Sequence, residues 1–225
     1  MIFGSISYLN LLPFQVFLKK HLTDSSSRMA FNYKRDVPSK INRALRKRHI
    51  HAGFISSIES PKYNATDLGI ISHKMVYSVF VIEGENKADK ESASSNQLAK
   101  VLNIQGEVII GDKALKFYLD GGEAIDLSQE WYNKTKLPFV FGRLCFNSHK
   151  KQIKHIAKKF IEHPIKIPQY ILKKEAKKRG ITPKQLLWYL EHIQYKMDYK
   201  AKKSLKLFLK LSHQTIQKTY PKEAK

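Results

Sequence analysis

The chain of 225 residues is poor in cysteine, glycine and proline, and each shortage excludes a class of protein. A single cysteine, Cys145, excludes a disulfide framework within the chain and a zinc site made of several cysteines. Ten glycines and eight prolines are too few for a fibrous chain, while 42% hydrophobic and 11% aromatic residues are too many for a disordered one. We therefore expect a globular protein of one or two compact lobes.

Residues 1–18 contain no charged side chain, so they have to be tested as a signal peptide or a membrane span. They have no basic n-region and no small-residue cleavage site. Polar residues such as Ser5, Ser7, Asn10 and Gln15 also interrupt the apolar run. We therefore expect no signal peptide and no membrane partner, and we predict a cytoplasmic protein, which also agrees with the shortage of cysteine.

Acidic side chains are scarce as well: 19 stand against 41 lysines and arginines, a formal net charge of +22. Residues 148–225 hold 21 of the basic and 5 of the acidic side chains. Such a charge suits a nucleic-acid binder, but this part shows neither stacking aromatics nor a reading motif. Its lysines alternate with apolar residues at helical spacing, as around Ile153, Ala157 and Phe160. We therefore predict amphipathic helices with solvated lysine faces and no nucleic-acid partner.

The first half alternates short β-rich runs with helical patterns, as βαβ units do. The expected strands are 2–6, 29–34, 51–55 and 68–71, and the expected helices are 11–22 and one that opens at Pro38. A β-rich run at 75–83 and a polar segment at 84–96 then lead to helix 95–102, strand 107–110, helices 112–118 and 126–133, and a second β-rich run at 137–146. Everything beyond is expected to be helical, with breaks at Pro164, Pro168 and 180–183.

This order predicts an α/β protein of two lobes joined by two extended crossings that act as a hinge. The larger lobe is expected to comprise 1–80 and 143–225, and the smaller lobe 81–142. Ligand is expected in the cleft between them, because loops after the carboxyl ends of strands and helix N-termini there bind anions. Three polar clusters fit such positions: SYLN at 7–10, SSIE at 56–59 and SASSN at 92–96. Each cluster alone is explained by helix capping, but the three together indicate a carboxylate site.

Several motifs resemble the menaquinone-biosynthesis family that includes chorismate dehydratase of the futalosine pathway. In chain order they are SYLN at 7–10 followed by Pro13, FISSIES at 54–60, LGIIS at 68–72 with VYSVFV at 76–81, SASSNQLAKVL at 92–102, GDKAL at 111–115 and DLSQEWYNKTKLPFVF at 126–141. The resemblance covers residues 1–145, and its most specific parts are the first and last of these motifs. The helical tail is similar only in general pattern.

The resemblance implies a fold like the type II periplasmic binding proteins, working as an enzyme without a metal or an organic cofactor. The implied reaction is the dehydration of chorismate, a dicarboxylate, to 3-[(1-carboxyvinyl)oxy]benzoate on the way to menaquinone. The sequence agrees, since it contains no HExxH, no Cys/His ligand set, no GxGxxG and no P-loop.

Carried over by motif, Asn10 is expected to contact the reacting region. The residues expected to bind the substrate carboxylates are Ser56, Ser57, Ser94 and Ser95, with Ser78 on the first crossing and Arg143 after the second as further candidates. In the small-lobe motif the family more often has Thr before the second serine. The change keeps a hydroxyl, and the motif does not specify which substrate atoms these hydroxyls contact. Asp112 is expected to cap the helix that follows it, Cys145 to be a buried thiol, and Trp131 to pack in the core.

Loss of water from chorismate requires removal of the C3 proton and departure of the C4 hydroxyl. No His or Lys stands in the matched motifs as a general base, and the only carboxylate among the candidate clusters, Glu59, is expected to point away from the cleft. We therefore predict substrate-assisted catalysis, in which the enolpyruvyl carboxylate takes the proton. The alternatives are a sister enzyme forming 1,4-dihydroxy-6-naphthoate, a non-catalytic binding protein for small carboxylates and, from charge alone, a nucleic-acid-binding module.

Overall fold

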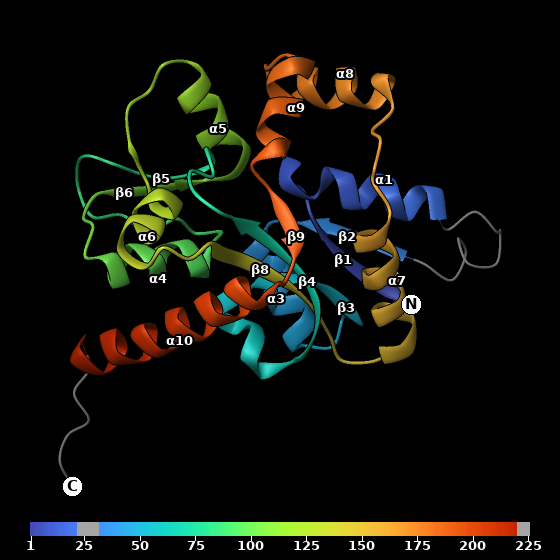
Figure 1. The fold of residues 1–225 in the computed structure, drawn as a ribbon, viewed down its shortest axis with the longest axis horizontal. Helices are drawn as coiled ribbons and strands as arrows, with labels where there is room; N and C mark the ends of the chain where they lie inside the picture. Colours follow the sequence, from blue (N-terminus) through green and yellow to red (C-terminus); the bar gives the residue numbers. More distant parts are fainter. Residues whose placement is uncertain (22–31, 220–225) are drawn as a thin grey trace, which may run out of the picture.

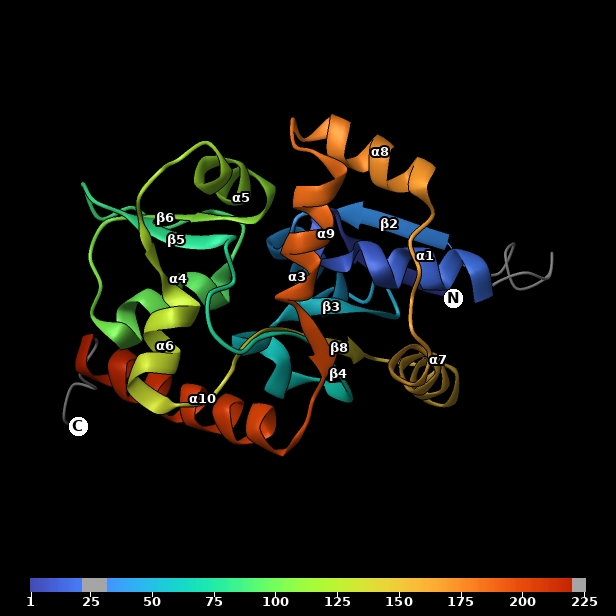
Figure 2. The ribbon, with the colours of Figure 1, turned by 45° about the horizontal axis from the view of Figure 1, so that its top comes forward.

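The computed structural model describes residues 1–21 and 32–219, which form two β-sheets with helices around them (Figures 1 and 2). The larger sheet contains, in spatial order, β2 (Asn32–Asp36), β1 (Ile2–Ile6), β3 (Ala52–Ser56), β8 (Phe139–Phe146), β4 (Asn64–Ser72) and β9 (Gln194–Lys196). The smaller sheet contains β6 (Glu107–Ile110), β5 (Val79–Ile82) and β7 (Ile125–Asp126). The turned view in Figure 2 separates the two sheets most clearly.

The helices of the first half connect these strands. They are the 3-10 helices η1 (Leu9–Leu11) and η2 (Ser57–Lys62) and the α-helices α1 (Leu12–His21), α3 (Pro38–Arg46), α4 (Ala93–Leu102), α5 (Gly111–Leu119) and α6 (Leu127–Thr135). As expected, α3 begins at Pro38, whose fixed φ suits a first helical position. Its buried face carries Ile41, Ala44 and Leu45, four or fewer residues apart, so burial of this stripe holds the helix on the sheet.

The chain passes between the two sheets twice. It leaves the larger sheet after β4, builds the smaller sheet, and returns as β8, which pairs antiparallel with both β3 and β4. The crossing segments, 73–78 and 136–138, are irregular, so the β-rich run predicted at 75–83 forms a strand only from Val79. In the first crossing the N–H groups of Val76 and Tyr77 donate to Asp126 instead of to a neighbouring strand. The predicted strand at 29–34 appears as β2, and residues 29–31 lie outside the described residues.

The tail contains α7 (Lys150–Glu162), α8 (Gln169–Lys178), α9 (Pro183–Glu191) and α10 (Tyr199–Thr219). The prediction that it is entirely helical is wrong, because β9 pairs with the edge of β4 between α9 and α10. The amphipathic stripe of α7 is confirmed: Ile153, Ala157 and Phe160 are buried. Phe160 packs edge-on against Phe14 with ring centroids 5.1 Å apart, which ties the tail to the core of the larger sheet.

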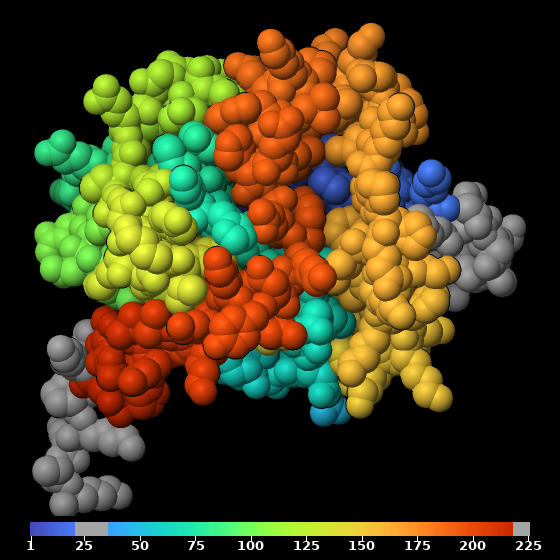
Figure 3. Space-filling view, viewed as in Figure 1, coloured from blue at the N-terminus to red at the C-terminus, as the bar shows by residue number. Residues whose placement is uncertain are grey.

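The last helix, α10, also covers the smaller sheet's helices. Trp131 of α6 is fully buried and donates from Nε1 to Ser204 Oγ at 2.9 Å, which confirms its packing role. On the face seen in Figure 3, the orange atoms of α9 border the green atoms of α5, and the red atoms of α10 lie below the yellow atoms of α6. The predicted lobe boundaries at 80/81 and 142/143 stay a prediction. The chain passes from one sheet to the other within residues 73–78 and 136–138.

Cys145 is fully buried in β8, as expected, and burial raises the pKa of its thiol to about 12. Within residues 1–21 and 32–219, no helix is both long and apolar enough to cross a membrane.

Candidate functional site

A narrow cavity of about 50 Å³, here called the central cavity, lies between the two sheets. Its walls are the apolar strand ends Ile6, Ile55, Ile70, Val79, Ile110 and Phe141 with their neighbours Pro38, Val76, Gly111 and Gly142. Its polar side chains are Tyr8, Asn10, Ser56, Ser78, Ser92 and Ser95. Four of the seven predicted site residues therefore meet here, and they come from segments that adjoin both sheets.

Asn10 enters the cavity from η1, directly after β1. Its side-chain Oδ1 is buried and has no hydrogen-bond partner in the described part of the chain. Buried polar atoms are normally paired, because an unpaired one costs about 1–3 kcal/mol. An unpartnered amide oxygen lining a cavity is therefore a group that a bound ligand can satisfy.

Ser56 lies at the carboxyl end of β3 and is held by Asn42 of α3. The Asn42 side chain donates to Ser56 Oγ at 2.9 Å and accepts the Ser56 N–H at 3.0 Å. Ser57 and Ser94 lie beside the cavity but do not line it. Their hydroxyls are 3.0 Å apart, and Ser94 Oγ also accepts the N–H of Ile58, so this fully buried pair joins the two sheets.

The smaller sheet brings two helix N-termini to the cavity. Ser92 caps α4 by accepting the Ser95 N–H at 3.2 Å, and its hydroxyl donates to Ser95 Oγ at 2.8 Å. Gly111 opens α5 on the same wall. The positive ends of two helix dipoles favour a carboxylate there. Ser78, in the first crossing, lies 2.9 Å from the hydroxyl of the buried Tyr189, whose pKa is raised by burial.

The Tyr8 ring lies against Gly111 at the start of α5 and forms part of the cavity wall. A side chain at Gly111, where φ is +71°, would meet the Tyr8 ring at 2.7 Å, so glycine is required for this close approach. The Tyr8 hydroxyl donates to Glu91 in the smaller-sheet part. Burial and the Glu91 carboxylate raise the pKa of Tyr8, so the hydroxyl stays a donor.

Arg143 does not line the central cavity: its Nη2 donates to the carbonyl of Thr66 at 3.0 Å, and its binding of the substrate stays a prediction. The role predicted for Asp112 is wrong. Asp112 does not cap α5, whose N-cap residue is Ile110. Its Oδ1 accepts the Leu9 N–H at 2.9 Å and its Oδ2 binds Arg179, while burial raises its pKa against the effect of Arg179.

Among the described residues, Tyr8 is the only titratable side chain that lines the cavity. Glu59 lies outside it and binds Lys62. The described ranges also contain no group of three or more His, Cys, Asp or Glu side chains placed to hold a metal ion. The cavity therefore offers neutral hydrogen-bonding groups and helix ends.

The sequence interpretation quoted the motifs that contain Tyr8 and Ser92 but did not select these residues. It missed Asn42, Tyr189, Arg179 and Tyr195 altogether. These residues act on the site across long sequence separations, for which a single sequence carries no signal.

Solved structures with the same architecture identify the fold. Protein AF1704 from Archaeoglobus fulgidus gives a TM-score of 0.70 at 13% identity, covering 95% of this chain and 96% of that one. A Candida albicans protein described as having the generic periplasmic binding protein fold gives a TM-score of 0.56 at 10% identity, covering 97% and 93% of the two chains. The predicted two-lobed, periplasmic-binding-protein-like fold is thereby confirmed.

Sequence similarity then identifies the family. The chain belongs to the menaquinone biosynthesis family, whose model matches residues 1–107 and 92–214. A curated chorismate dehydratase from Campylobacter jejuni is 48% identical to it over 215 residues, which cover 93% of this chain and 96% of that protein. The resemblance stated from the motifs is therefore confirmed.

Proposed function

We propose that the chain is a chorismate dehydratase, a hydro-lyase of the futalosine route to menaquinone that forms 3-[(1-carboxyvinyl)oxy]benzoate and water. The observation that carries the proposal is the unpartnered Oδ1 of Asn10 in a cavity that also receives two helix N-termini. The 48% identity to a chorismate dehydratase supports the substrate. The expected cytoplasmic location stays a prediction of the sequence.

In this proposal the substrate carboxylates bind at the helix ends and serine hydroxyls. Ser95 at the start of α4 and Ser56 at the end of β3 lie on the cavity wall and present hydroxyls from opposite sheets. Ser78 adds a third hydroxyl from the crossing. Ser57 and Ser94 bond to each other beside the cavity, so their role is to hold the two sheets together around the substrate.

Asn10 is the catalytic residue of the proposal. Its Oδ1 accepts a hydrogen bond from the ring hydroxyl and fixes the ring conformer in which the C3 proton faces the enolpyruvyl carboxylate. That carboxylate takes the proton, the C3–H electron pair forms the new ring double bond, and the C4 hydroxyl leaves as water with the proton that the carboxylate has taken. Substrate-assisted proton transfer is favoured because Tyr8, the one titratable side chain among the described lining residues, is held protonated.

The size of the central cavity adds a conformational step. About 50 Å³ holds only a few water molecules, whereas chorismate has a six-membered ring and two carboxylates. The sheets have to separate for chorismate to enter and then close around it, which also excludes water from the reaction.

The first experiment is to incubate the protein with chorismate, without added metal or cofactor, and follow the product by ultraviolet absorbance and mass spectrometry. Asn10→Ala is expected to lower kcat by about 10²–10³-fold, as removal of one well-placed hydrogen-bonding group does in other enzymes. Glu59→Gln is the matched control, because Glu59 binds Lys62 outside the cavity. Full activity of Asn10→Ala, or loss of activity in Glu59→Gln, contradicts the assignment.

Unchanged chorismate together with a raised melting temperature would favour a binding protein over an enzyme. The sister reaction that forms 1,4-dihydroxy-6-naphthoate is disfavoured, because it is expected to need a catalytic histidine and none lines the cavity among the described residues.

A further inference from the structure

The loop that carries Asn10 is held by side chains from distant parts of the chain. Tyr195 of β9 donates from its hydroxyl to the Asn10 carbonyl at 2.6 Å. Arg179, which follows α8, donates from Nη2 to the Ser7 carbonyl at 3.0 Å. Asp112 of α5 accepts the Leu9 N–H at 2.9 Å and also binds Arg179. Three outside groups therefore bond to the backbone of residues 7–10.

These bonds matter because the loop has few stabilising hydrogen bonds within itself. η1 is only three residues long, and its N-cap residue, Tyr8, makes no capping hydrogen bond with its side chain. A short 3-10 helix of this kind is marginal without tertiary contacts. The position of the Asn10 amide in the central cavity therefore depends on bonds made to its backbone from behind.

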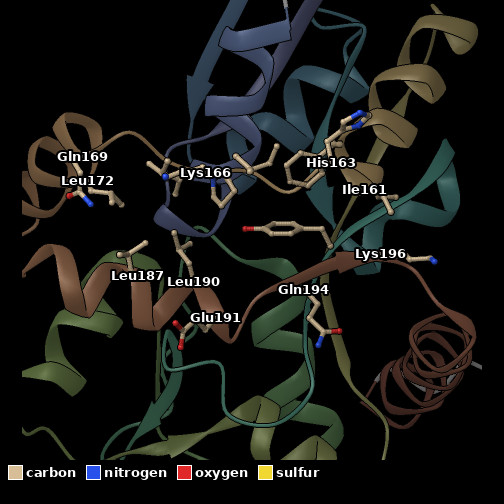
Figure 4. A pocket seen from close by; sticks show the side chains of 15 residues that line it. Ile161, His163, Lys166, Gln169, Leu172, Leu187, Leu190, Glu191, Gln194 and Lys196 are labelled. Atoms are coloured by element: carbon tan, nitrogen blue, oxygen red, sulfur yellow. The ribbon is translucent and has the colours of Figure 1, made fainter.

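Tyr195 has two separable roles in this arrangement. Its ring packs edge-on against Phe160 with centroids 5.1 Å apart, and it lines a hollow of about 740 Å³ outside the central cavity. Figure 4 shows the side chains around this hollow, with Leu187 and Leu190 of α9 on one wall and Lys166 and Ile161 on the other. The ring contact is packing, whereas the hydroxyl reaches the catalytic loop.

We infer that Tyr195 is a positioning residue for the dehydration, which fixes the Asn10 amide in the cavity through the hydrogen bond of its hydroxyl to the Asn10 carbonyl. The inference rests on the proposed function for its effect on turnover, but the bond itself does not. Burial raises the pKa of Tyr195 well above its ordinary value, so the hydroxyl remains a donor throughout the neutral range. Arg179 and Asp112 assist by holding the two residues on either side of Tyr8.

The test compares Tyr195→Phe with two controls. Tyr195→Phe removes the hydroxyl and keeps the ring, so kcat for chorismate is expected to fall about tenfold or more while KM changes less than about twofold. Phe160→Leu disturbs the ring packing and leaves the hydroxyl bond in place, so it is expected to lower the melting temperature more than kcat. Tyr63→Phe removes a partly buried tyrosine hydroxyl elsewhere and is expected to change neither.

A second measurement does not depend on activity. Hydrogen–deuterium exchange in a peptide covering residues 7–12 is expected to accelerate in Tyr195→Phe and to stay unchanged in Tyr63→Phe. Unchanged kcat together with unchanged exchange would overturn the inference, as would equal kcat losses in Tyr195→Phe and Phe160→Leu. If the wild-type protein leaves chorismate intact, the proposed function fails, and the exchange result alone then decides whether Tyr195 positions the loop.

Discussion

At the scale of single residues, Asp126 accepts four backbone N–H groups beside the first crossing. One carboxylate oxygen accepts the N–H groups of Val76 and Tyr77 in the first crossing. The other accepts those of Ser128 and Gln129 in the first turn of α6. The side chain is 4% exposed, so water cannot reach these N–H groups if the carboxylate is removed. Asp126 therefore fixes the course of the crossing relative to the smaller sheet.

Asp126→Asn is expected to destabilise the protein by about 2–4 kcal/mol, because the amide NH₂ cannot accept and leaves two buried N–H groups unpaired. The measurement is urea unfolding followed by circular dichroism. Asp120→Asn makes the same chemical change at an exposed position and is expected to stay within about 0.5 kcal/mol of the wild type. Equal effects of the two substitutions would show that the four bonds contribute little.

The sequence indicated part of the site at this scale. Asn10, Ser56 and Ser95 were predicted from motifs that follow strands or open a helix, and Ser78 from its place on the first crossing; all four line the central cavity. The groups that hold them were not predicted, because Tyr195 lies 185 residues from Asn10 and Arg179 lies 172 residues from Ser7. Arg143 lies outside the cavity wall, and its contact with the Thr66 carbonyl, 77 residues away, is equally absent from a single sequence.

At the scale of elements, the strands predicted from β-branched and aromatic runs were found, and the two short ones were missed. β9 has three residues, Gln194, Tyr195 and Lys196, whose composition does not indicate a strand. It is a strand because the edge of β4 offers it partners, which is a tertiary cause. β7 has two residues and is equally invisible to periodicity.

His51 joins two strands of the larger sheet to helix α7. Its Nδ1 accepts the N–H of Ile2 at the start of β1 at 2.8 Å, and it directly precedes β3. Its ring lies edge-on to His149, the N-cap residue of α7, with centroids 4.8 Å apart. Burial, and secondarily the charge of His149, lowers the pKa of His51, so the folded protein favours the neutral ring that can accept this bond.

Stability is therefore expected to depend on the charge of His51. The unfolded chain takes up a proton near the ordinary histidine pKa of about 6.5, before the folded one does, so the contribution is present above that pH and is lost as the pH falls below it. The midpoint of urea unfolding is expected to drop less between pH 7.5 and pH 5.5 in His51→Gln than in the wild type. His155→Gln, at an exposed position of α7, is the control and is expected to keep the wild-type pH dependence.

At the scale of the whole molecule, the two sheets are closed against each other. The Tyr8–Glu91 bond, the Ser57–Ser94 bond and the Arg179–Asp112 ion pair all link parts that belong to different sheets. The central cavity of about 50 Å³ is too small for chorismate, so the two sheets have to separate before chorismate binds. The rate of binding is therefore expected to depend on how strongly these bonds favour closure.

Glu91→Gln weakens the acceptor for the Tyr8 hydroxyl and is expected to speed the association of chorismate severalfold by destabilising the closed form. Stopped-flow tryptophan fluorescence in an Asn10→Ala background measures this rate without turnover. Glu85→Gln, in the exposed loop nearby, removes the same charge and is the control for electrostatic attraction of the substrate. Equal association rates in the two variants would exclude the Tyr8–Glu91 bond as a gate.

The positions of the supporting groups along the chain have a consequence for how the protein is made. Every described residue that lines the central cavity lies between Ile6 and Gly142, whereas three of the groups that hold it from behind, Arg179, Tyr189 and Tyr195, follow later in the chain. Synthesis proceeds from the N-terminus, so the ribosome supplies all the cavity residues before these three groups. We therefore expect a nascent chain to become able to bind chorismate only after β9 has emerged and paired with β4.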